Sequence, residues 1–319
     1  MRVSVIVPSY NKALYLRRAL DSIASQTLAD FEVIVVDDGS SDGSTELAAA
    51  YPDPRFRTIK QANAGPGAAR NRGLAEARGP ITAFLDADDY WRPMYLETGV
   101  GVLESCPEAA TFTCGSSEEP GGHSTEALWR ARGIGQGLQR VTPRTSAKLL
   151  THMSSYMHTC STMIRTQAAR KWGGFYDRNG CRFGEDTVLW LKVLVNDAVS
   201  FELAPLAVID RGASALSGNY KGARPVEPFL ADPEEIAAVC PPELAGVLRS
   251  FYALRACKTA AVLGYWSQSR QARRLLGRFV SARDWRQPFF AAALLACTPL
   301  GGLAGRLVRA VALRHTTSV

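Results

Sequence analysis

Paired cysteines and long apolar runs are both missing from this chain of 319 residues. Its seven cysteines are scattered without any C-x-x-C spacing, which argues against a disulfide framework or a structural zinc site and favours reduced thiols in a cytoplasm. The best candidate for a membrane span, residues 289–304, is broken by Pro299 and two glycines and is shorter than the roughly 20 residues that cross a bilayer. The first apolar run, residues 3–7, has the length of a strand and not of a secretory signal. We therefore expect a cytoplasmic protein without a spanning helix.

Acidic residues are nearly absent from the C-terminal quarter of the chain. Residues 241–319 contain 12 Lys and Arg but only Glu243 and Asp284 as acids, whereas the preceding residues are slightly acidic within an overall formal charge of +7. This asymmetry predicts that the C-terminal region meets an anionic partner. No nucleic-acid-reading motif accompanies the charge, so we expect no nucleic-acid partner.

One segment of this basic region, residues 269–279, has helical spacing with one basic and one apolar face. The residues of the two faces are Arg270, Arg273, Arg274 and Arg278, and Leu275, Leu276 and Phe279. Such a helix can lie on an anionic bilayer, which would place the protein peripherally on the inner face of the cell membrane. A helix that packs its apolar side on the body of the protein has the same pattern, so both interpretations remain open.

The first 114 residues alternate short β-branched runs with helix-like stretches. Strands are predicted at residues 3–7, 31–36, 56–59, 81–85 and 110–114, and helices at 13–26, 44–51, 67–77 and 93–104. Strands without a polar face, each followed by a helix, predict an α/β fold with a mostly parallel sheet covered on both faces. Residues 115–145 have the composition of a loop, and a further helix is expected near 185–196.

Polar residues follow three of the predicted strands, at the point where each strand ends. They are Pro8, Ser9, Tyr10 and Asn11, then Asp37 and Asp38, then Asp86, Asp88 and Asp89. Ligands of open α/β sheets bind beyond these carboxyl ends. Five carboxylates there would repel one another without a counter-charge, and carboxylate oxygens suit Mg2+ or Mn2+. A nucleoside diphosphate is then the expected partner of the ion. For Asp37 alone, helix capping is the simpler interpretation.

Four segments within residues 2–91 have a recognisable order and spacing: VSVIVPSYNKALYLRRALDSIASQT, FEVIVVDDGSSDGS, NAGPGAARNRGL and ITAFLDADDYW. They closely resemble family 2 of the inverting glycosyltransferases, which have the GT-A fold. The resemblance continues more loosely through residues 173–193 and covers about 210 residues. It implies a GT-A domain over residues 1–215, with a nucleotide-sugar donor half at 1–114 and an acceptor half at 115–215. A hinge at 216–235 and a basic helical C-terminal region at 236–319 would follow.

The resemblance implies a donor site built from the first half. Pro8 and Tyr10 would line the uracil or another base, with Asn11 beside them among the donor-binding residues. Asp38 would hydrogen-bond the edge of the base, and Arg70 would lie near the nucleotide.

The resemblance also implies roles for the later acidic residues. Asp86 would lie near the ribose, and Asp88 would bind Mn2+ or Mg2+ with Asp89 as a helper. Asp186 matches the general base of the family, and Glu185 could share or take that role. The alternative is that Glu185 and Asp186 only open the following helix, where the helix dipole favours acids.

Histidines depart from the family pattern. Many relatives carry a metal- or phosphate-binding histidine near the position that Arg211 occupies here, so Arg211 could partly replace the cation. The four histidines of this chain, His158 among them, lack ligand spacing and are expected to be structural.

The expected function is transfer of a sugar, with inversion, from a nucleotide-sugar donor to an acceptor hydroxyl. UDP is the default nucleotide by resemblance. The acceptor would be a glycan or a lipid-linked molecule in bacterial polysaccharide or cell-envelope glycan synthesis. Two alternatives remain, a sugar nucleotidyltransferase and a non-catalytic nucleotide-binding scaffold. A Rossmann-type NAD site is disfavoured because no G-x-G-x-x-G follows the first strand.

Overall fold

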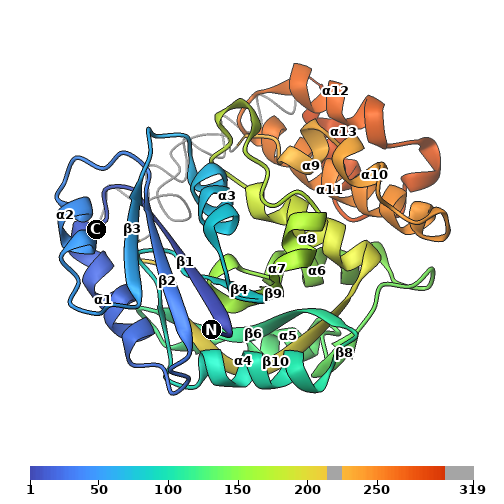
Figure 1. Cartoon of the computed structure of the whole chain (residues 1–319). Coiled ribbons are helices and arrows are strands. Elements are labelled where there is room, and N and C mark those ends of the chain that lie inside the picture. Colours follow the sequence, from blue (N-terminus) through green and yellow to red (C-terminus); the bar gives the residue numbers. More distant parts are fainter. Residues whose placement is uncertain (214–224, 299–319) are drawn as a thin grey trace.

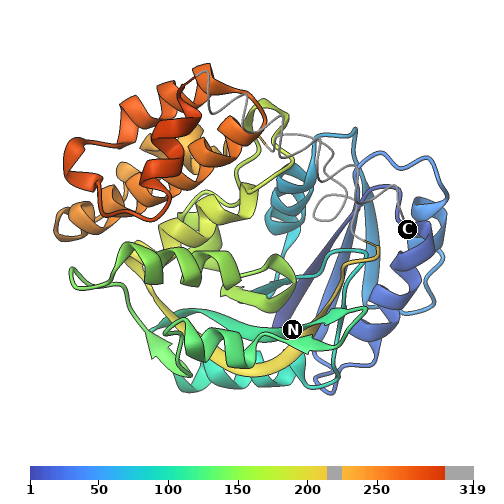
Figure 2. The same ribbon diagram turned by 180° about the vertical axis from the view of Figure 1, so that it is seen from behind.

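Residues 1–213 and 225–298 are described by a computed structural model of the chain (Figures 1 and 2). The strands are β1 (Val3–Ser9), β2 (Phe31–Asp37), β3 (Phe56–Lys60), β4 (Ile81–Phe84), β5 (Tyr90–Trp91), β6 (Ala109–Glu119), β7 (His123–Ser124), β8 (Gly137–Gln139), β9 (Thr162–Arg165) and β10 (Ala198–Asp210). They form one sheet in the order β3-β2-β1-β4-β9-β6-β10-β5, with β7 beside β6 and β8 beside β10.

The sheet is parallel where the first half of the chain builds it. β3, β2, β1 and β4 run in the same direction, and β10 is parallel to β6. β9 is antiparallel to both of its neighbours, β4 and β6. The expected α/β fold with a mostly parallel sheet and flanking helices is therefore confirmed.

Helices cover both faces of this sheet (Figure 1). Those within residues 1–213 are α1 (Ala13–Ala24), α2 (Ser44–Ala49), α3 (Pro66–Glu76), α4 (Tyr95–Ser105), α5 (Glu126–Ala131), α6 (Ala147–Tyr156), α7 (Thr166–Lys171) and α8 (Glu185–Asn196). Those within residues 225–298 are α9 (Pro228–Ala231), α10 (Glu234–Ala237), α11 (Ala245–Tyr265), α12 (Ser269–Phe279) and α13 (Phe290–Ala296).

The apolar character of the central strands follows from this two-sided cover. In β1, Val5 and Val7 belong to the core cluster beneath α1, which contains Leu16 and Leu20. Ile6, the residue between the two valines, belongs to the cluster on the other face. Side chains of a strand alternate between faces, so a strand covered on both faces is apolar at most positions.

Residues 115–145, expected to be a loop, contain regular structure. β6 extends to Glu119 through Ser116 and Ser117, which are buried although they are polar. α5 follows and places Trp129 in the core, where its side chain has no exposed surface. The ladder that the end of β6 forms with β10 and β7 satisfies the polar backbone of residues 115–119, and a count of polar residues does not reveal such pairing.

Residues 225–298 form a helical lobe on the side of the sheet away from α1 and α2 (Figures 1 and 2). Part of the segment expected to be a hinge belongs to this lobe, because α9 buries Phe229 and Leu230. Residues 216–224 of the expected hinge and 299–319 of the basic region lie outside the described residues. Phe229 shares one core cluster with Trp190 of α8 and Phe251 of α11, so the lobe and the sheet-bearing body have a continuous core.

The amphipathic segment 269–279 is a helix, α12, as its pattern predicts. Its apolar residues Leu275 and Leu276 are buried in the core cluster that also contains α11 residues. The apolar face of α12 is thus covered by the protein, which favours packing on the body over bilayer contact for this face. No helix in the described parts of the chain combines the length and the apolar character needed to cross a membrane.

Candidate active site

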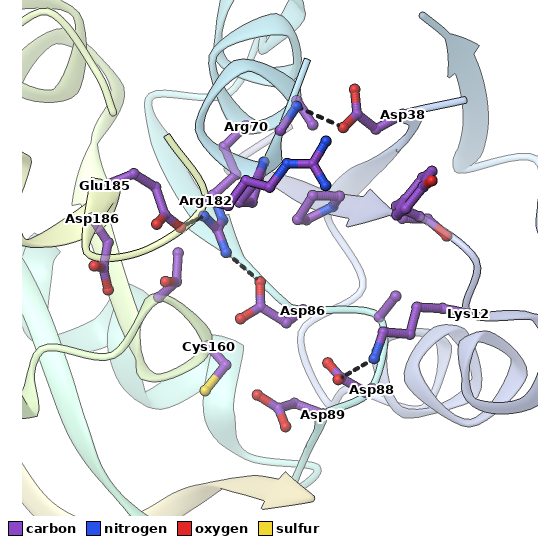
Figure 3. Close-up of a pocket in the computed structure, with 18 of the residues that line it drawn as sticks. Lys12, Asp38, Arg70, Asp86, Asp88, Asp89, Cys160, Arg182, Glu185 and Asp186 are labelled. Carbon is purple, nitrogen blue, oxygen red and sulfur yellow. Dashed lines mark hydrogen bonds and ion pairs between the residues drawn. The ribbon is translucent and has the colours of Figure 1, made fainter. Parts of the chain in front are cut away.

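A cavity of about 520 Å3 lies at the edge of the sheet where β1 and β4 end (Figure 3). This volume is within the usual range for a small-molecule site. Its wall includes Pro8, Tyr10, Asp38, Arg70, Asp86, Asp88, Asp89, Glu185 and Asp186. All the predicted site residues except Asn11 therefore line one cavity, although residues 8 and 186 are far apart in the sequence.

Asn11 does not line the cavity but shapes the turn next to it. It has a positive φ of 52°, a conformation in which asparagine is one of the tolerated non-glycine residues. Its side-chain oxygen accepts a hydrogen bond of 2.8 Å from the backbone N–H of Ser41. Asn11 thus ties the turn after β1 to the loop after β2, and leaves the neighbouring Tyr10 45% exposed at the cavity.

Asp38 is the most fully hydrogen-bonded carboxylate of the site. One oxygen accepts from the backbone N–H of Ala64 and from Gln61 Nε2, both at 2.8 Å, and the other accepts from the N–H of Gly65 at 2.9 Å. These bonds hold the chain that enters α3 against the end of β2. Asp38 is 3% exposed, so only a small part of it can reach a ligand.

Arg70 of α3 joins the two halves of the site. Its guanidinium donates to Asp86 Oδ1 and to Glu185 Oε1, both at 2.6 Å, and the side chain is buried. Charge-assisted bonds of this kind are strong when they are removed from water. Arg70 therefore fixes the segment after β4 relative to the start of α8.

Asp88 and Asp89 have different environments, although they are adjacent. Asp88 Oδ2 accepts a hydrogen bond of 2.6 Å from Lys12 Nζ. Asp89 turns inward, where it accepts the backbone N–H of Asp210 at 3.0 Å. Burial, with help from the charges of Asp86 and Asp88, raises the pKa of Asp89 to about 8. Asp89 therefore braces the loop from within, whereas Asp88 faces the cavity.

Glu185 and Asp186 face the cavity from the side opposite Asp86 and Asp88 (Figure 3). Glu185 is held by Arg70, whereas Asp186 Oδ1 accepts only from the backbone N–H and the hydroxyl of Thr187, the residue that follows it. No cation pairs directly with Asp186 among the described residues. Burial is the main cause that raises the pKa of Asp186 above its usual value. A carboxylate of this kind is a stronger proton acceptor than an exposed aspartate.

Several cationic or aromatic side chains of the cavity were not among the predicted site residues. They are Lys12, His158, Arg182 and Phe183. Lys12 follows Asn11 directly, so its position beside the turn was a usable signal. His158, expected to be structural, lines the cavity with Arg211, and burial and the Arg211 charge lower its pKa to about 4. It reaches the cavity through the turn before β9, which local spacing does not reveal.

The fit of a divalent cation depends on Asp88. Within residues 1–213 and 225–298, no three His, Cys, Asp or Glu side chains are arranged to hold a metal ion. Asp86 is paired with Arg70, and Asp89 points inward. A hard cation nevertheless needs only one or two carboxylates where substrate phosphates and water complete its shell. The lining is compatible with such an ion, for which the Asp88 carboxylate is the available protein oxygen donor, and the described residues do not form an all-protein cage.

Comparison with known proteins identifies the family of the chain. The family model described as glycosyl transferase family 2 matches residues 4–173, more than half of the chain. The chain is 47% identical over 109 residues to an uncharacterized glycosyltransferase of Nostoc sp., covering 33% of this chain and 34% of that protein. It is 45% identical over 97 residues to the putative glycosyltransferase EpsH of Bacillus subtilis, covering 30% and 28%. These matches span about a third or less of the relatives' own length.

Solved structures resemble most of the chain. S. aureus TarS 1–349 in complex with UDP has a TM-score of 0.65 at 18% identity, over 97% of this chain and 91% of that one. The mannosyltransferase PcManGT from Pyrobaculum calidifontis, in complex with GDP-Man and Mn2+, has a TM-score of 0.50 at 18% identity, over 93% and 86%. At these identities the likeness supports the GT-A fold. The family match over more than half of the chain shows that the chain belongs to glycosyltransferase family 2.

Proposed function

We propose that this glycosyltransferase moves a sugar, with inversion, from a nucleotide diphosphate sugar to an acceptor hydroxyl, and that it depends on a divalent metal. The observation that carries the proposal is the position of Asp186 across the cavity from Asp86 and Asp88. One carboxylate can then accept the proton of an acceptor while the leaving diphosphate lies at the other wall. A UDP-sugar is our first candidate, because TarS 1–349 has been solved with UDP-GlcNAc and shares this fold.

The general base is Asp186 in this proposal. Its carboxylate takes the proton from the acceptor hydroxyl as the hydroxyl oxygen attacks the anomeric carbon. Glu185 is less suited to act as the base, because its carboxylate forms an ion pair with Arg70 at 2.6 Å. A single base without a second carboxylate nucleophile gives one displacement, and hence inversion at the anomeric carbon. A retaining reaction would need a nucleophile on the opposite face of the sugar.

The remaining side chains would hold the donor. Tyr10 and Pro8 offer an apolar wall for the base, and Asp38 keeps an edge in the cavity. Mn2+ or Mg2+ bound at Asp88 would act as a Lewis acid that offsets the charge of the leaving diphosphate. Arg70 holds Asp86 in place at the same wall of the cavity.

Two measurements test this proposal. Thermal shifts with UDP, GDP and dTDP, each with and without Mn2+, should show stabilisation of about 2.7 kcal/mol at one hundred times the dissociation constant. Asp186→Asn should bind the nucleotide with nearly unchanged affinity and lose sugar transfer, whereas the half-exposed control Glu126→Gln on α5 should keep both. Normal turnover by Asp186→Asn would show that the base is another residue. No shift with any nucleotide would favour a scaffold function.

We propose further that the acceptor is a glycan or lipid-linked molecule met at an anionic membrane surface. The helical lobe exposes large apolar residues beside exposed arginines. They are Trp285, Phe289, Leu294 and Leu295, with Arg283 and Arg286. An interfacial tryptophan within a basic surface is typical of bilayer contact. This surface, and not the buried apolar face of α12, is the one we expect to touch lipid.

Vesicle binding tests the membrane proposal. The protein should float with phosphatidylglycerol vesicles and not with phosphatidylcholine vesicles. Trp285→Ser combined with Leu294→Ser should abolish flotation, whereas Leu128→Ser, at a residue 41% exposed on α5, should not. A wild-type protein that ignores anionic vesicles would contradict the proposal. Self-association that the same double substitution abolishes would contradict it as well.

A further inference from the structure

Lys12 lies at the site where the donor diphosphate and its metal would meet. It follows the turn at Asn11 and directly precedes α1. Its Nζ donates to Asp88 Oδ2 at 2.6 Å and to the carbonyl oxygen of Ala213 at 3.0 Å (Figure 3). The side chains of Lys12 and Asp88 are 18% and 13% exposed. The ammonium group therefore occupies the carboxylate that is best placed to bind a metal ion.

The other two carboxylates of the segment have partners of a different kind. Asp86 is held by the buried guanidinium of Arg70, and Asp89 by the backbone N–H of Asp210. Neither partner can leave without disturbing the fold around it. Lysine, in contrast, carries its charge on a flexible four-carbon stem. Asp88 is thus the only one of the three whose charged partner can move away at small cost to the structure.

A divalent cation and the Lys12 ammonium exclude each other at Asp88. Both would contact the same carboxylate, so they would lie a few ångströms apart in a partly buried cavity. Repulsion between like charges is strong at such a distance, because the local dielectric is well below that of water. In the absence of a further anion, the ammonium that is already bound therefore opposes the entry of the metal. A donor diphosphate supplies that anion, and offers Lys12 a new partner.

We infer that Lys12 is an exchangeable counter-ion of Asp88. When the donor diphosphate binds, the Lys12 ammonium leaves Asp88 and pairs with a phosphate oxygen, and the metal ion binds Asp88 in its place. The inference rests on the proposed function and extends it. Its consequence is linkage: the metal binds weakly to the free protein, and the metal and the diphosphate each increase affinity for the other by the same factor. The free enzyme would thus keep its acidic site neutralised without a tightly bound metal.

Mn2+ binding, measured by electron paramagnetic resonance of the free ion, tests this linkage without any activity assay. Wild-type protein, Lys12→Met, Lys12→Arg and the exposed control Lys148→Met would each be titrated with and without UDP. In wild-type protein, UDP should tighten Mn2+ binding by roughly tenfold or more, within the usual range of coupling between sites. Lys12→Met should bind Mn2+ roughly tenfold more tightly than wild-type protein when UDP is absent. UDP should tighten Mn2+ binding further in this variant, through its phosphate oxygens, but by a smaller factor than in wild-type protein. Lys148→Met should behave as wild type.

Two outcomes would overturn the inference while the proposed function survives. One is an unchanged Mn2+ affinity in Lys12→Met. The other is loss of UDP binding in Lys12→Met together with no effect of Mn2+ on UDP binding by the wild type, which would make Lys12 a permanent phosphate ligand. A wild-type protein that binds no UDP at all would overturn both the proposed function and the inference.

A second measurement covers a Lys12→Met variant that does not fold. Reductive 13C-methylation labels the lysine side chains of the wild-type chain, and Lys12→Arg assigns the Lys12 signal. That signal should keep its position with Mg2+ alone and move when Mg2+ and UDP are added together. A signal that moves with Mg2+ alone, or that never moves, would contradict the exchange.

Discussion

The donor half lines the cavity directly, whereas the helical lobe supports one of its walls from outside. In the donor half, polar side chains at strand ends are held by hydrogen bonds from neighbouring loops, as Asp38 is by the backbone N–H groups of Ala64 and Gly65. The lobe supplies no side chain to the cavity wall. It packs instead on α8, whose first residues are Glu185 and Asp186. The proposed base therefore lies on a helix that is held by an interface outside the cavity.

Polar contacts strengthen the junction between α8 and the lobe. Lys192 of α8 is 9% exposed and pairs with Glu235 at 2.8 Å. Arg178, in the turn before α8, reaches the same Glu235 at 2.6 Å. Removing Glu235 would leave the Lys192 ammonium buried beside only the carbonyl oxygen of Trp172. The lobe therefore helps to hold the helix that carries the proposed base. The strand ends of the donor half are held by contacts of their own.

The largest expected effect comes from breaking the apolar part of this junction. Phe251 of α11 is 1% exposed and has its ring centroid 5.4 Å from that of Phe229. Phe251→Ala should reduce the free energy of unfolding by about 3–5 kcal/mol, because the cavity cannot fully collapse. Hydrogen exchange should accelerate first in α8 and α11, and later in β1 and β2.

The matched control for this change is on the same helix. Val262 of α11 is 41% exposed, so Val262→Ala should change the free energy of unfolding by about 0.5 kcal/mol or less. Equal exchange rates in α8 and β1 after Phe251→Ala would show that the lobe supports the whole sheet and not α8 in particular.

The two regions also differ in how far they could be predicted from sequence. In the donor half, apolar runs and the polar residues that end them predicted β1, β2 and β4 and the gathering of Asp86 and Asp88, because these patterns are local. In the lobe, the spacing of α12 predicted an apolar face but not what covers it, which is the preceding helix α11. The pairing of Lys12 with Asp88 spans 76 positions, and no local pattern encodes it.

The second prediction concerns the inward carboxylate of the donor half. The pKa of Asp89 is raised to about 8 in the folded protein, against about 3.9 in an unfolded chain. Between these values the folded state holds a proton that the unfolded state has lost, so stability should fall as pH rises from about 4 to 8. The slope from one such group is at most about 1.4 kcal/mol per pH unit.

Asp89→Asn should remove this contribution, because an amide oxygen can still accept the N–H of Asp210. Urea unfolding at pH 5 and pH 7.5, with EDTA present, would measure the difference between wild type and variant. The variant should gain on the wild type as pH rises, whereas the exposed control Glu46→Gln should not. A parallel pH dependence in wild type and Asp89→Asn would show that Asp89 is already ionised near pH 5 in the folded protein.

The smallest expected effects come from substitutions of two helix glycines in the donor half. One of these glycines is closely packed against a strand, and the other lies on an open helix surface. A Cβ on Gly73 of α3 would lie 2.4 Å from Ile6 Cγ2, in the middle of β1. Gly73→Ala should therefore cost about 1–3 kcal/mol through overpacking. A Cβ on Gly101 of α4 would meet nothing within 4 Å, so Gly101→Ala should stabilise the protein by up to about 1 kcal/mol through helix propensity. A lower melting temperature for Gly73→Ala and a higher one for Gly101→Ala would confirm that α3 is closely packed against β1. This packing matters for the site because α3 carries Arg70. A stabilising Gly73→Ala would mean that α3 can shift away from β1, and the distances between Arg70 and its two carboxylates would then not be fixed by packing.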